Sequence, residues 1–317
     1  MTPTQLRAFA CVVRLGSVKA AAKELAVSEA AVSMHVAQLR KEFDDLLFTR
    51  ASSGLAFTPG GLRLASRAVE ILGLQDRTVR EVSQAGLGRR VLRLACTSLF
   101  AEHAAPGLID LFAARADDLE VELSVRPVEQ LPSLLLARSA DVAVGPVGPP
   151  RDDLAVISFL RYEVVVAARP GHPLAGHPVG GAEVRRAMWA LGPAAVGTTG
   201  VMPTVLRRLG VPEKHQRIFQ SQAAAIEETK GSDAVTLAVR FAIGADVAAR
   251  RLSILDGPGL RAQGSWSAMA LPAHTQIPVA AELMRFITTP RATQAMVKGA
   301  GVDLGRFRPT IHVTLWS

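Results

Sequence analysis

The stretch from Ser17 to Leu39 constrains the fold of this chain more than any other part of the sequence. Ser17 and Ser28 each precede a run with helical periodicity, where a serine hydroxyl can accept a hydrogen bond from an unpaired first-turn amide. The first run is rich in alanine, so a second helix can cross it closely. In the second run Val32, Val36 and Leu39 recur at spacings of four and three, which makes one face apolar. The pattern predicts a helix-turn-helix, which places its second helix in the DNA major groove.

The same stretch has a second interpretation, because alanine-rich helical hairpins with serine caps also occur in ordinary bundles. The flanking residues favour DNA binding. Upstream, Thr2-Pro3-Thr4-Gln5 combines a capping box with a proline at the first helical position, and it predicts another helix that ends at Gly16. Downstream, residues 47–57 predict a β-hairpin with its turn at 51–54. Such a wing lies over the sugar-phosphate backbone or enters the minor groove.

Polar and small residues on the second helix and the wing are the candidate DNA contacts. They are Ser28, Glu29, Ala30, Ser33, Met34, His35, Arg50 and Ser53. Ser33 can bond a base edge or a phosphate, Glu29 can accept from a cytosine amine, and Ala30 can touch a thymine methyl. We expect Arg50 and Ser53 to hold phosphates and to fix the register. The alternative for each residue is an ordinary place on the surface.

A long helix is predicted from Pro59 to about Ala85, with Thr58 as its cap. Apolar residues recur along it in steps of three and four, with Asp76 as an interruption. They are Leu62, Ala65, Val69, Leu72 and Val79. This weak heptad seam predicts pairing with a second copy of the chain, and packing against the chain's own residues is the alternative. The Gly-rich segment at 86–90 predicts a hinge.

Composition limits the class of protein and its partners. The first 90 residues hold 13 Lys and Arg against 8 Asp and Glu, whereas the rest of the chain holds 23 against 20. This basic excess favours a polyanion partner for the N-terminal part, with a solvated basic surface as the alternative. We expect no membrane contact, because no apolar run reaches the roughly 20 residues of a spanning helix. The start lacks the layout of a secretory signal, and Cys11 and Cys96 suit a reducing cytoplasm.

Beyond residue 91 the sequence changes to alternating strands and helices. The strands predicted for the first part are 91–96, 121–125, 141–145, 154–160 and 162–168, with helices from 98 to about 115 and from about 129 to 137. Repeated βαβ winding builds a parallel sheet that helices cover on both faces. A second α/β lobe follows residue 169, and residues 265–271 predict a strand that returns to the first lobe. Two lobes with two crossing strands resemble a periplasmic-type binding fold, whose cleft lies between the lobes.

At this point the sequence resembles the LysR-type transcriptional regulators. The resemblance is dense over residues 3–67 and thinner to about residue 300. The residues that carry it are Gln5-Leu6-Arg7-Ala8-Phe9, Gly16-Ser17, Ala21-Ala22, Leu25, Val27-Ser28, Ala31-Val32-Ser33, Leu39, Leu47-Phe48-Thr49-Arg50, Thr58-Pro59-Gly60-Gly61, Asp141-Val142-Ala143-Val144-Gly145 and His172-Pro173-Leu174-Ala175. Their order and spacing together are specific, whereas no single piece is.

The resemblance implies an α/β protein with an all-α-type N-terminal winged helix-turn-helix, a long linker helix and a two-lobed, periplasmic-binding-protein-like effector domain. We expect the DNA-binding domain at 1–58, the dimerisation helix and hinge at 59–88, and the effector-binding domain at 89–317. Lobe I would comprise about 89–160 and 266–317, and lobe II about 161–265. Such a cytoplasmic regulator would bind an inverted-repeat promoter site in double-stranded DNA and a small-molecule effector. It would form a homodimer and then a tetramer, with RNA polymerase as a further candidate partner.

Small polar residues at predicted strand ends and loops are the candidate effector contacts. They are Thr97, Ser98, Thr198, Thr199 and Ser221. Thr97 and Ser98 precede a helix whose first amides suit a carboxylate or another anion, and simple capping is the alternative. Thr198 and Thr199 are expected to face them from lobe II. These walls offer hydroxyls and helix-start amides but no obvious buried acid, which favours a small anionic or polar metabolite over a cation.

Other classes of protein explain less of the sequence. We expect no catalytic residue, metal or cofactor, because no nucleophile elbow, phosphate loop, dinucleotide fingerprint or metal-ligand histidine spacing is present. A solute-binding protein would account for residues 91–300 but not for the first 90. The remaining alternative is a cytosolic small-molecule-binding protein without sequence-specific DNA binding. The salt dependence of duplex binding distinguishes that alternative from a regulator.

Overall fold

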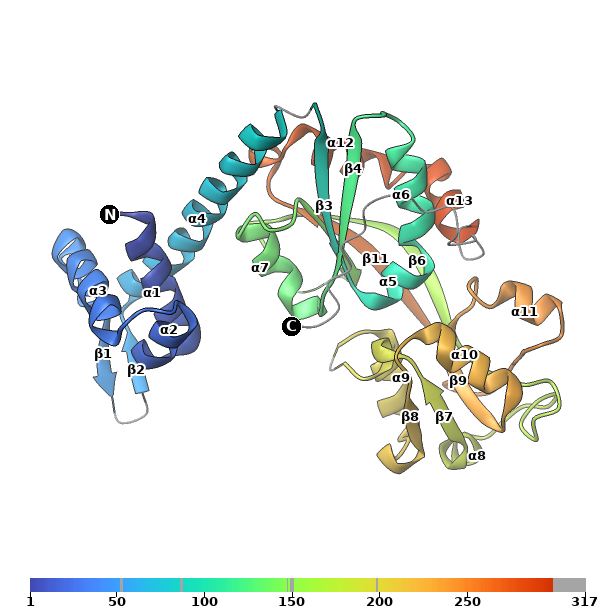
Figure 1. Cartoon of the computed structure of the whole chain (residues 1–317). Coiled ribbons are helices and arrows are strands. Elements are labelled where there is room, and N and C mark those ends of the chain that lie inside the picture. Colours follow the sequence, from blue (N-terminus) through green and yellow to red (C-terminus); the bar gives the residue numbers. More distant parts are fainter. Residues whose placement is uncertain (52–53, 86–87, 147, 149–150, 198, 299–317) are drawn as a thin grey trace. The chain divides into compact units, whose positions relative to one another are not determined.

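The computed structural model describes residues 1–51, 54–85, 88–146, 148, 151–197 and 199–298 (Figure 1). The chain divides into two compact units. The first comprises Met1–Gly88 together with the short segment Leu136–Ser139, and the second comprises Arg89–Leu135 and the residues from Ala140 onward.

The first unit is built from helices and one hairpin. Its elements are α1 (Pro3–Leu15), α2 (Val18–Glu24), α3 (Glu29–Phe43), β1 (Phe48–Ala51), β2 (Gly54–Phe57) and α4 (Pro59–Ala85). The predicted caps of the helix-turn-helix are present: Ser17 Oγ accepts from the Ala20 amide at 3.2 Å, and Ser28 Oγ accepts from the Ala31 amide at 3.1 Å. Gly16 ends α1 with φ +63°, a conformation that glycine adopts without a steric penalty. Local hydrogen bonds thus delimit the helices where the sequence predicted them.

Aromatic side chains join the hairpin to the helices of the first unit. Phe48 of β1 stacks on Phe9 of α1 with ring centroids 6.5 Å apart, and it meets the ring of Phe57 edge-on at 5.8 Å. Phe48 and Phe57 are also partners in the antiparallel register of the hairpin. The same core contains the fully buried Val32 and Leu39 of α3. The wing therefore has a fixed position relative to α3.

One face of the long helix α4 packs against other residues of its own chain. Ala68 and Leu72 form a buried cluster with Leu6 of α1, and Ala65 belongs to the main core of the unit. Other apolar residues of α4 are exposed: Leu62, Val69, Ile71, Leu74, Val79 and Val82. The predicted seam is therefore divided. Ala65 and Leu72 pack inside the chain, which is the alternative that the sequence left open, whereas the remaining seam residues stay on the surface.

The second unit is organised around one mixed sheet. Its described strands are β3 (Arg90–Cys96), β4 (Leu119–Val125), β5 (Val142–Pro146), β6 (Ala155–Ala168), β7 (Met188–Leu191), β8 (Gln216–Ile218), β9 (Ala234–Val239), β10 (Ser253–Ile254) and β11 (Arg261–Ala270). They follow the order β4-β3-β5-β11-β6-β9-β7-β8, and β10 pairs with β6. The two strands predicted at 154–160 and 162–168 are wrong as separate elements, because β6 is continuous. It pairs with β11 along its length and with β9 at its end, so β6 and β11 join the two lobes.

Helices cover this sheet (Figure 1). They are α5 (Ser98–His103), α6 (Ala105–Ala113), α7 (Leu131–Leu136), α8 (Gly181–Arg186), α9 (Val201–Leu209), α10 (Gln222–Gly231), α11 (Gly244–Ala248), α12 (Pro278–Phe286) and α13 (Pro290–Lys298). The single helix predicted from 98 to about 115 is wrong, since the backbone leaves helical geometry at Ala104 with φ −129° and ψ −33°. Pro106 has no amide to donate to the preceding turn, which explains the break.

The crossing strands are fixed to each other by aromatic packing. Tyr162 of β6 stacks on Trp266 of β11 with centroids 4.2 Å apart, and Phe100 meets the same indole edge-on at 5.2 Å. A Cβ atom at Gly264 would lie 2.4 Å from the Tyr162 ring, so only glycine fits there.

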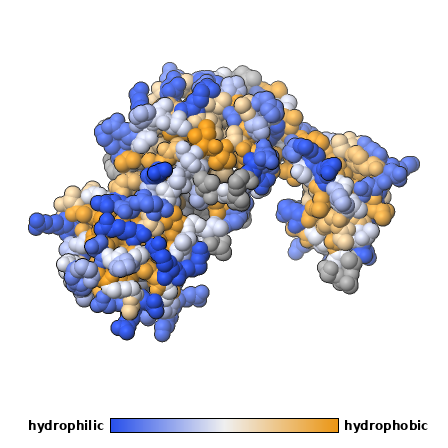
Figure 2. Space-filling model, turned by 180° about the vertical axis from the view of Figure 1, so that it is seen from behind, coloured by the Kyte–Doolittle hydropathy of each residue, from blue (hydrophilic) through white to orange (hydrophobic). Residues whose placement is uncertain are grey.

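In the described part of the chain no helix combines the length and apolar character of a membrane span. On the face shown in Figure 2, hydrophilic and hydrophobic side chains are interspersed.

Candidate functional site

Helix α3 presents most of the predicted base-contacting residues to solvent. Its buried side faces the core through Val32, Val36 and Leu39. The exposed members of the predicted set are Ser28, Glu29, Ala30, Ser33 and Met34. His35 is half-buried, and its Nδ1 atom has no hydrogen-bond partner among the described residues. One side of α3 is therefore anchored, and the other is open to a partner.

Helical geometry adds two residues that the sequence reasoning missed. At 100° per residue, the positions opposite the buried side are Ala30, Met34, Ala37 and Lys41. Ala37 and Lys41 are exposed, and each lies seven residues after a member of the predicted set. That spacing is visible in the sequence and is the signal that would have found them. The exposed Ser28 side chain already has a structural role, because its hydroxyl caps α3.

One arginine of the wing is exposed, whereas a nearby arginine of α3 already has partners within the chain. Arg50 on β1 is exposed and forms no ion pair among the described residues. Arg40 of α3, in contrast, donates to the Phe48 carbonyl at 2.7 Å and lies 4.6 Å from the centroid of the Phe48 ring. Arg40 thus stabilises the junction of helix and wing, and Arg50 is available to a phosphate. Ser53 lies outside the described residues.

Thr97 and Ser98 lie where β3 passes into α5. The Thr97 amide donates to the Val144 carbonyl at 3.1 Å, which holds this turn against β5. Thr97 is the N-cap residue of α5, yet its side chain makes no capping hydrogen bond. The hydroxyls of both residues lack a hydrogen-bond partner within the part of the chain that the structure describes. Simple capping therefore does not explain the Thr97 side chain.

Thr199 of lobe II contacts lobe I in the region of Thr97. Its hydroxyl donates to Oε1 of Glu129 at 3.0 Å. Val128, the residue before Glu129, and the methyl group of Thr97 both lie close to Gly145. A Cβ atom added at Gly145 would lie 3.3 Å from Thr97 Cγ2 and 3.9 Å from Val128 Cγ2. The structure therefore brings Thr97 and Thr199 to the same part of the lobe boundary. Thr198 lies outside the described residues.

Ser221 and an unforeseen acid meet at the start of α10. Ser221 Oγ accepts from the Ala224 amide at 3.1 Å, so this hydroxyl caps α10. Glu102 of α5 reaches across the lobe boundary, and its Oε2 atom accepts from the Gln222 amide at 2.9 Å. Burial raises the pKa of Glu102, against the opposing effect of hydrogen bonds from the amides of Gln222 and Ala223. Glu102 is half-buried, and the sequence reasoning did not single out this acid.

Two neighbouring groups of lobe I are buried in apolar surroundings. Burial lowers the pKa of His103 to about 4, and its Nε2 atom has no partner among the described residues. Cys96 is fully buried, as expected for a small hydrophobic residue, and burial raises the pKa of its thiol. Raised thiol pKa values disfavour the reactive thiolate. In the described part of the chain, no cluster of three or more His, Cys, Asp or Glu side chains has metal-binding geometry.

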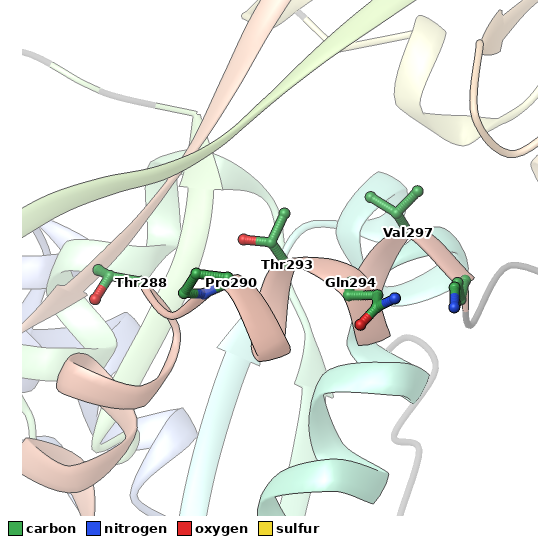
Figure 3. A pocket seen from close by; sticks show the side chains of 6 residues that line it. Thr288, Pro290, Thr293, Gln294 and Val297 are labelled. Carbon is green, nitrogen blue, oxygen red and sulfur yellow. The ribbon is translucent and has the colours of Figure 1, made fainter.

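A surface pocket lies elsewhere in the second unit (Figure 3). Its volume is about 460 Å3, and its lining residues are Thr288, Pro290, Thr293, Gln294, Val297 and Lys298. These residues belong to α13 and the turn before it, and none is a predicted effector contact. The pocket contains no buried charged group that would orient a ligand, so we assign it no binding role.

Known proteins match both parts of the chain. Residues 3–62 match the family described as bacterial regulatory helix-turn-helix protein, lysR family, and residues 85–290 match the LysR substrate binding domain. An uncharacterized HTH-type transcriptional regulator of Mycobacterium tuberculosis is 54% identical, with 100% of each chain covered. The RuBisCO operon transcriptional regulator of Allochromatium vinosum is 28% identical over 91% of this chain and 96% of that one.

Solved structures show the same fold. ArgP from Mycobacterium tuberculosis matches with a TM-score of 0.59 at 17% identity, covering 94% of this chain and 96% of that chain. CbnR, a LysR family transcriptional regulator, matches with a TM-score of 0.52 at 20% identity, covering 96% and 100%. At these identities the likeness concerns the fold alone.

Proposed function

The chain belongs to the LysR family of DNA-binding transcriptional regulators, and from this premise we propose that it binds an inverted-repeat promoter site as a dimer under the control of a small polar metabolite. The metabolite would bind in a cleft between lobes I and II of the effector domain. A dimer related by twofold symmetry presents two copies of α3, which matches the symmetry of an inverted repeat. The proposal includes a cytoplasmic location, where the protein would meet the chromosome, and RNA polymerase as a candidate partner.

The observation that carries the DNA-binding part is the open side of α3 next to an exposed wing arginine. Ser33 and Met34 offer a hydroxyl and an apolar contact to base edges, and Lys41 adds a charge at the end of the helix. Arg50 on the wing supplies a phosphate contact that fixes the register. Base contacts would then determine which DNA sequence the protein prefers, and Arg50 would contribute to the affinity for any duplex.

For the effector, we propose hydroxyl contacts from both lobes. Thr97 and Ser98 contribute unoccupied hydroxyls from lobe I, and Thr199 contributes from lobe II a hydroxyl that donates to Glu129. Between the alternatives of an anionic and an uncharged polar metabolite, we favour the uncharged one, because the carboxylates of Glu102 and Glu129 both lie at the lobe boundary. These carboxylates would repel an anionic ligand, most strongly near Glu102, which is half-buried, whereas Glu129 is exposed. The ligand controls DNA binding only if its affinity differs between two arrangements of the domains.

Salt-dependent binding tests the proposal directly. Bound genomic sites are mapped first, and a labelled duplex from one site is titrated with the full-length protein at several salt concentrations. We expect the logarithm of the binding constant to fall linearly with the logarithm of salt concentration. A protein that binds small molecules but not specific DNA would bind this duplex no better than a scrambled one. That result would reject the proposed sequence-specific DNA binding and favour a small-molecule-binding protein that does not recognise a DNA sequence.

A further inference from the structure

The carboxylate of Glu102 stands where the start of a helix would hold an anion. Its Oε2 atom accepts from the Gln222 amide at 2.9 Å, and the Ala223 amide also bonds to this carboxylate. The next amide, that of Ala224, donates to Ser221 Oγ. The first-turn amides of the ten-residue helix α10 are therefore occupied. Helix starts attract anions through these amides and the helix dipole, and here a residue from the opposite lobe supplies the anion.

Glu102 has no cationic partner that would explain its burial. It forms no ion pair among the described residues, and its only described partners are amides of α10. Glu102 is half-buried, and partial burial of a carboxylate without a cation carries a desolvation cost that the amides at the helix start offset. Two buried polar atoms, one on the next residue along α5 and one on the side chain of Gln222, also lack partners among the described residues: Nε2 of His103 and Oε1 of Gln222. Glu102 is thus not part of an ordinary ion-pair network.

Glu102 also lies among the predicted effector contacts. Ser98 precedes it by four residues on α5, a spacing that puts both side chains on one side of the helix. Its amide partner, Gln222, directly follows Ser221. Any ligand held by Ser98 and Ser221 would therefore lie next to this carboxylate.

We propose that Glu102 determines the specificity of the effector cleft, because its carboxylate occupies the anion position at α10 and excludes effectors that carry a carboxylate there. The inference rests on the proposed function, in that it takes the lobe boundary as the effector site. The cleft of the natural protein then selects an uncharged polar group at this end. Removal of the Glu102 side chain converts the same amides into a site for a small free carboxylate.

Chemical rescue with acetate tests this assignment without knowledge of the natural effector. Amide hydrogen exchange of the segment 221–224 is measured by mass spectrometry in the full-length wild type and in Glu102→Ala. We expect exchange at these amides to become about tenfold faster in Glu102→Ala, since charge-assisted hydrogen bonds are lost. Because small anions bind weakly, acetate at about 100 mM is compared with chloride at equal ionic strength. Acetate should restore protection in Glu102→Ala and leave the wild type unchanged.

Controls separate this result from general effects. Glu129→Ala removes the other carboxylate at the lobe boundary and should leave the exchange of 221–224 insensitive to acetate. If Glu102→Ala does not fold, the same exchange measurement is made on Glu102→Ser, whose small polar side chain still leaves room for acetate. Equal acetate protection of the wild type, or no rescue in the folded variant, would overturn the proposal. Failure of the proposed function would instead appear as missing specific DNA binding by the wild type, which this experiment does not measure.

Discussion

Single side chains determine which charges of the DNA-binding unit are available to a partner. Arg40 is held by the Phe48 carbonyl and by the face of the Phe48 ring, so its charge stabilises the wing. Arg14 pairs with Glu24. Arg50 remains exposed and forms no ion pair in the described part of the chain. The basic excess of the N-terminal part is therefore only partly available, and Arg50 is the wing residue that we expect to meet phosphate.

Arg50→Ala is expected to weaken binding to specific and scrambled duplexes alike, because a phosphate contact carries no sequence information. The slope of log affinity against log salt should become shallower by about one unit. Arg186→Ala, an exposed arginine of the effector domain, is the matched control and should change neither quantity. If Arg50→Ala left affinity and slope unchanged, the wing would not contact the backbone.

His103 is expected to make stability depend on pH. Burial lowers its pKa to about 4 from an ordinary value of 6.5. Between these values the unfolded chain binds a proton that the native chain does not, so stability falls as the pH drops from 6.5 toward 4. At pH 5 this contribution amounts to about 2 kcal/mol. Urea unfolding at pH 7 and pH 5 should show a smaller loss for His103→Gln than for the wild type. Equal losses would mean that His103 is not buried as a neutral group.

Among the elements, α4 has one face satisfied within the chain and another without cover. Ala68 and Leu72 pack against Leu6, whereas Val79 and Val82 are 61% and 71% exposed. A 27-residue helix with this much exposed apolar surface is expected to pair with another surface, and a second α4 offers the same pattern. We therefore place the dimer interface on the part of the seam that the chain leaves exposed.

A double substitution in the second half of α4 tests this interface. Val79→Asp with Val82→Asp should raise the dimer dissociation constant about a hundredfold or more, because two valines that the dimer would bury are replaced by charges. Sedimentation velocity over a concentration series measures the change. Arg63→Asp changes the charge at an exposed position on another side of the same helix and should leave the dimer intact. A wild-type monomer at micromolar concentration would contradict the assignment.

At the scale of the whole molecule, the two lobes are joined both by strands and by side chains. β6 and β11 pass between them, with Tyr162 and Trp266 stacked at 4.2 Å. Two polar contacts add to this connection, one from Glu102 to the start of α10 and one from Thr199 to Glu129. A ligand that replaces either contact would shift the balance between lobe arrangements, provided that it binds them with different affinity.

Thr97→Val and Thr199→Val test the effector assignment. Metabolites are first screened for those that raise the melting temperature of the wild type. Each substitution should weaken the affinity for an identified effector about tenfold, because a hydroxyl contact is lost with little change in volume. Thr293→Val in the pocket of Figure 3 is the matched control and should not change it. Unchanged affinity in both cleft variants would place the effector elsewhere.

The sequence by itself determined the local structure of this protein and its family. The caps at Ser17 and Ser28 and the buried stripe of α3 follow from contacts within a few residues, so spacing alone predicts them. The domain boundaries and the individual DNA and effector contacts stay predictions. The missed residues Ala37 and Lys41 show that a stricter use of helical spacing would have extended the recognition surface.

Only the tertiary structure decided which partners meet over long distances in the chain. It made residues 155–168 one strand, divided the α4 seam between α1 and the surface, and brought Glu102 to the Gln222 amide. Each outcome depends on how segments far apart in sequence pack together, and residue spacing carries no information about that packing. The proposed character of the effector site depends on such a contact, because the Glu102 carboxylate becomes, after folding, the anion at the start of α10.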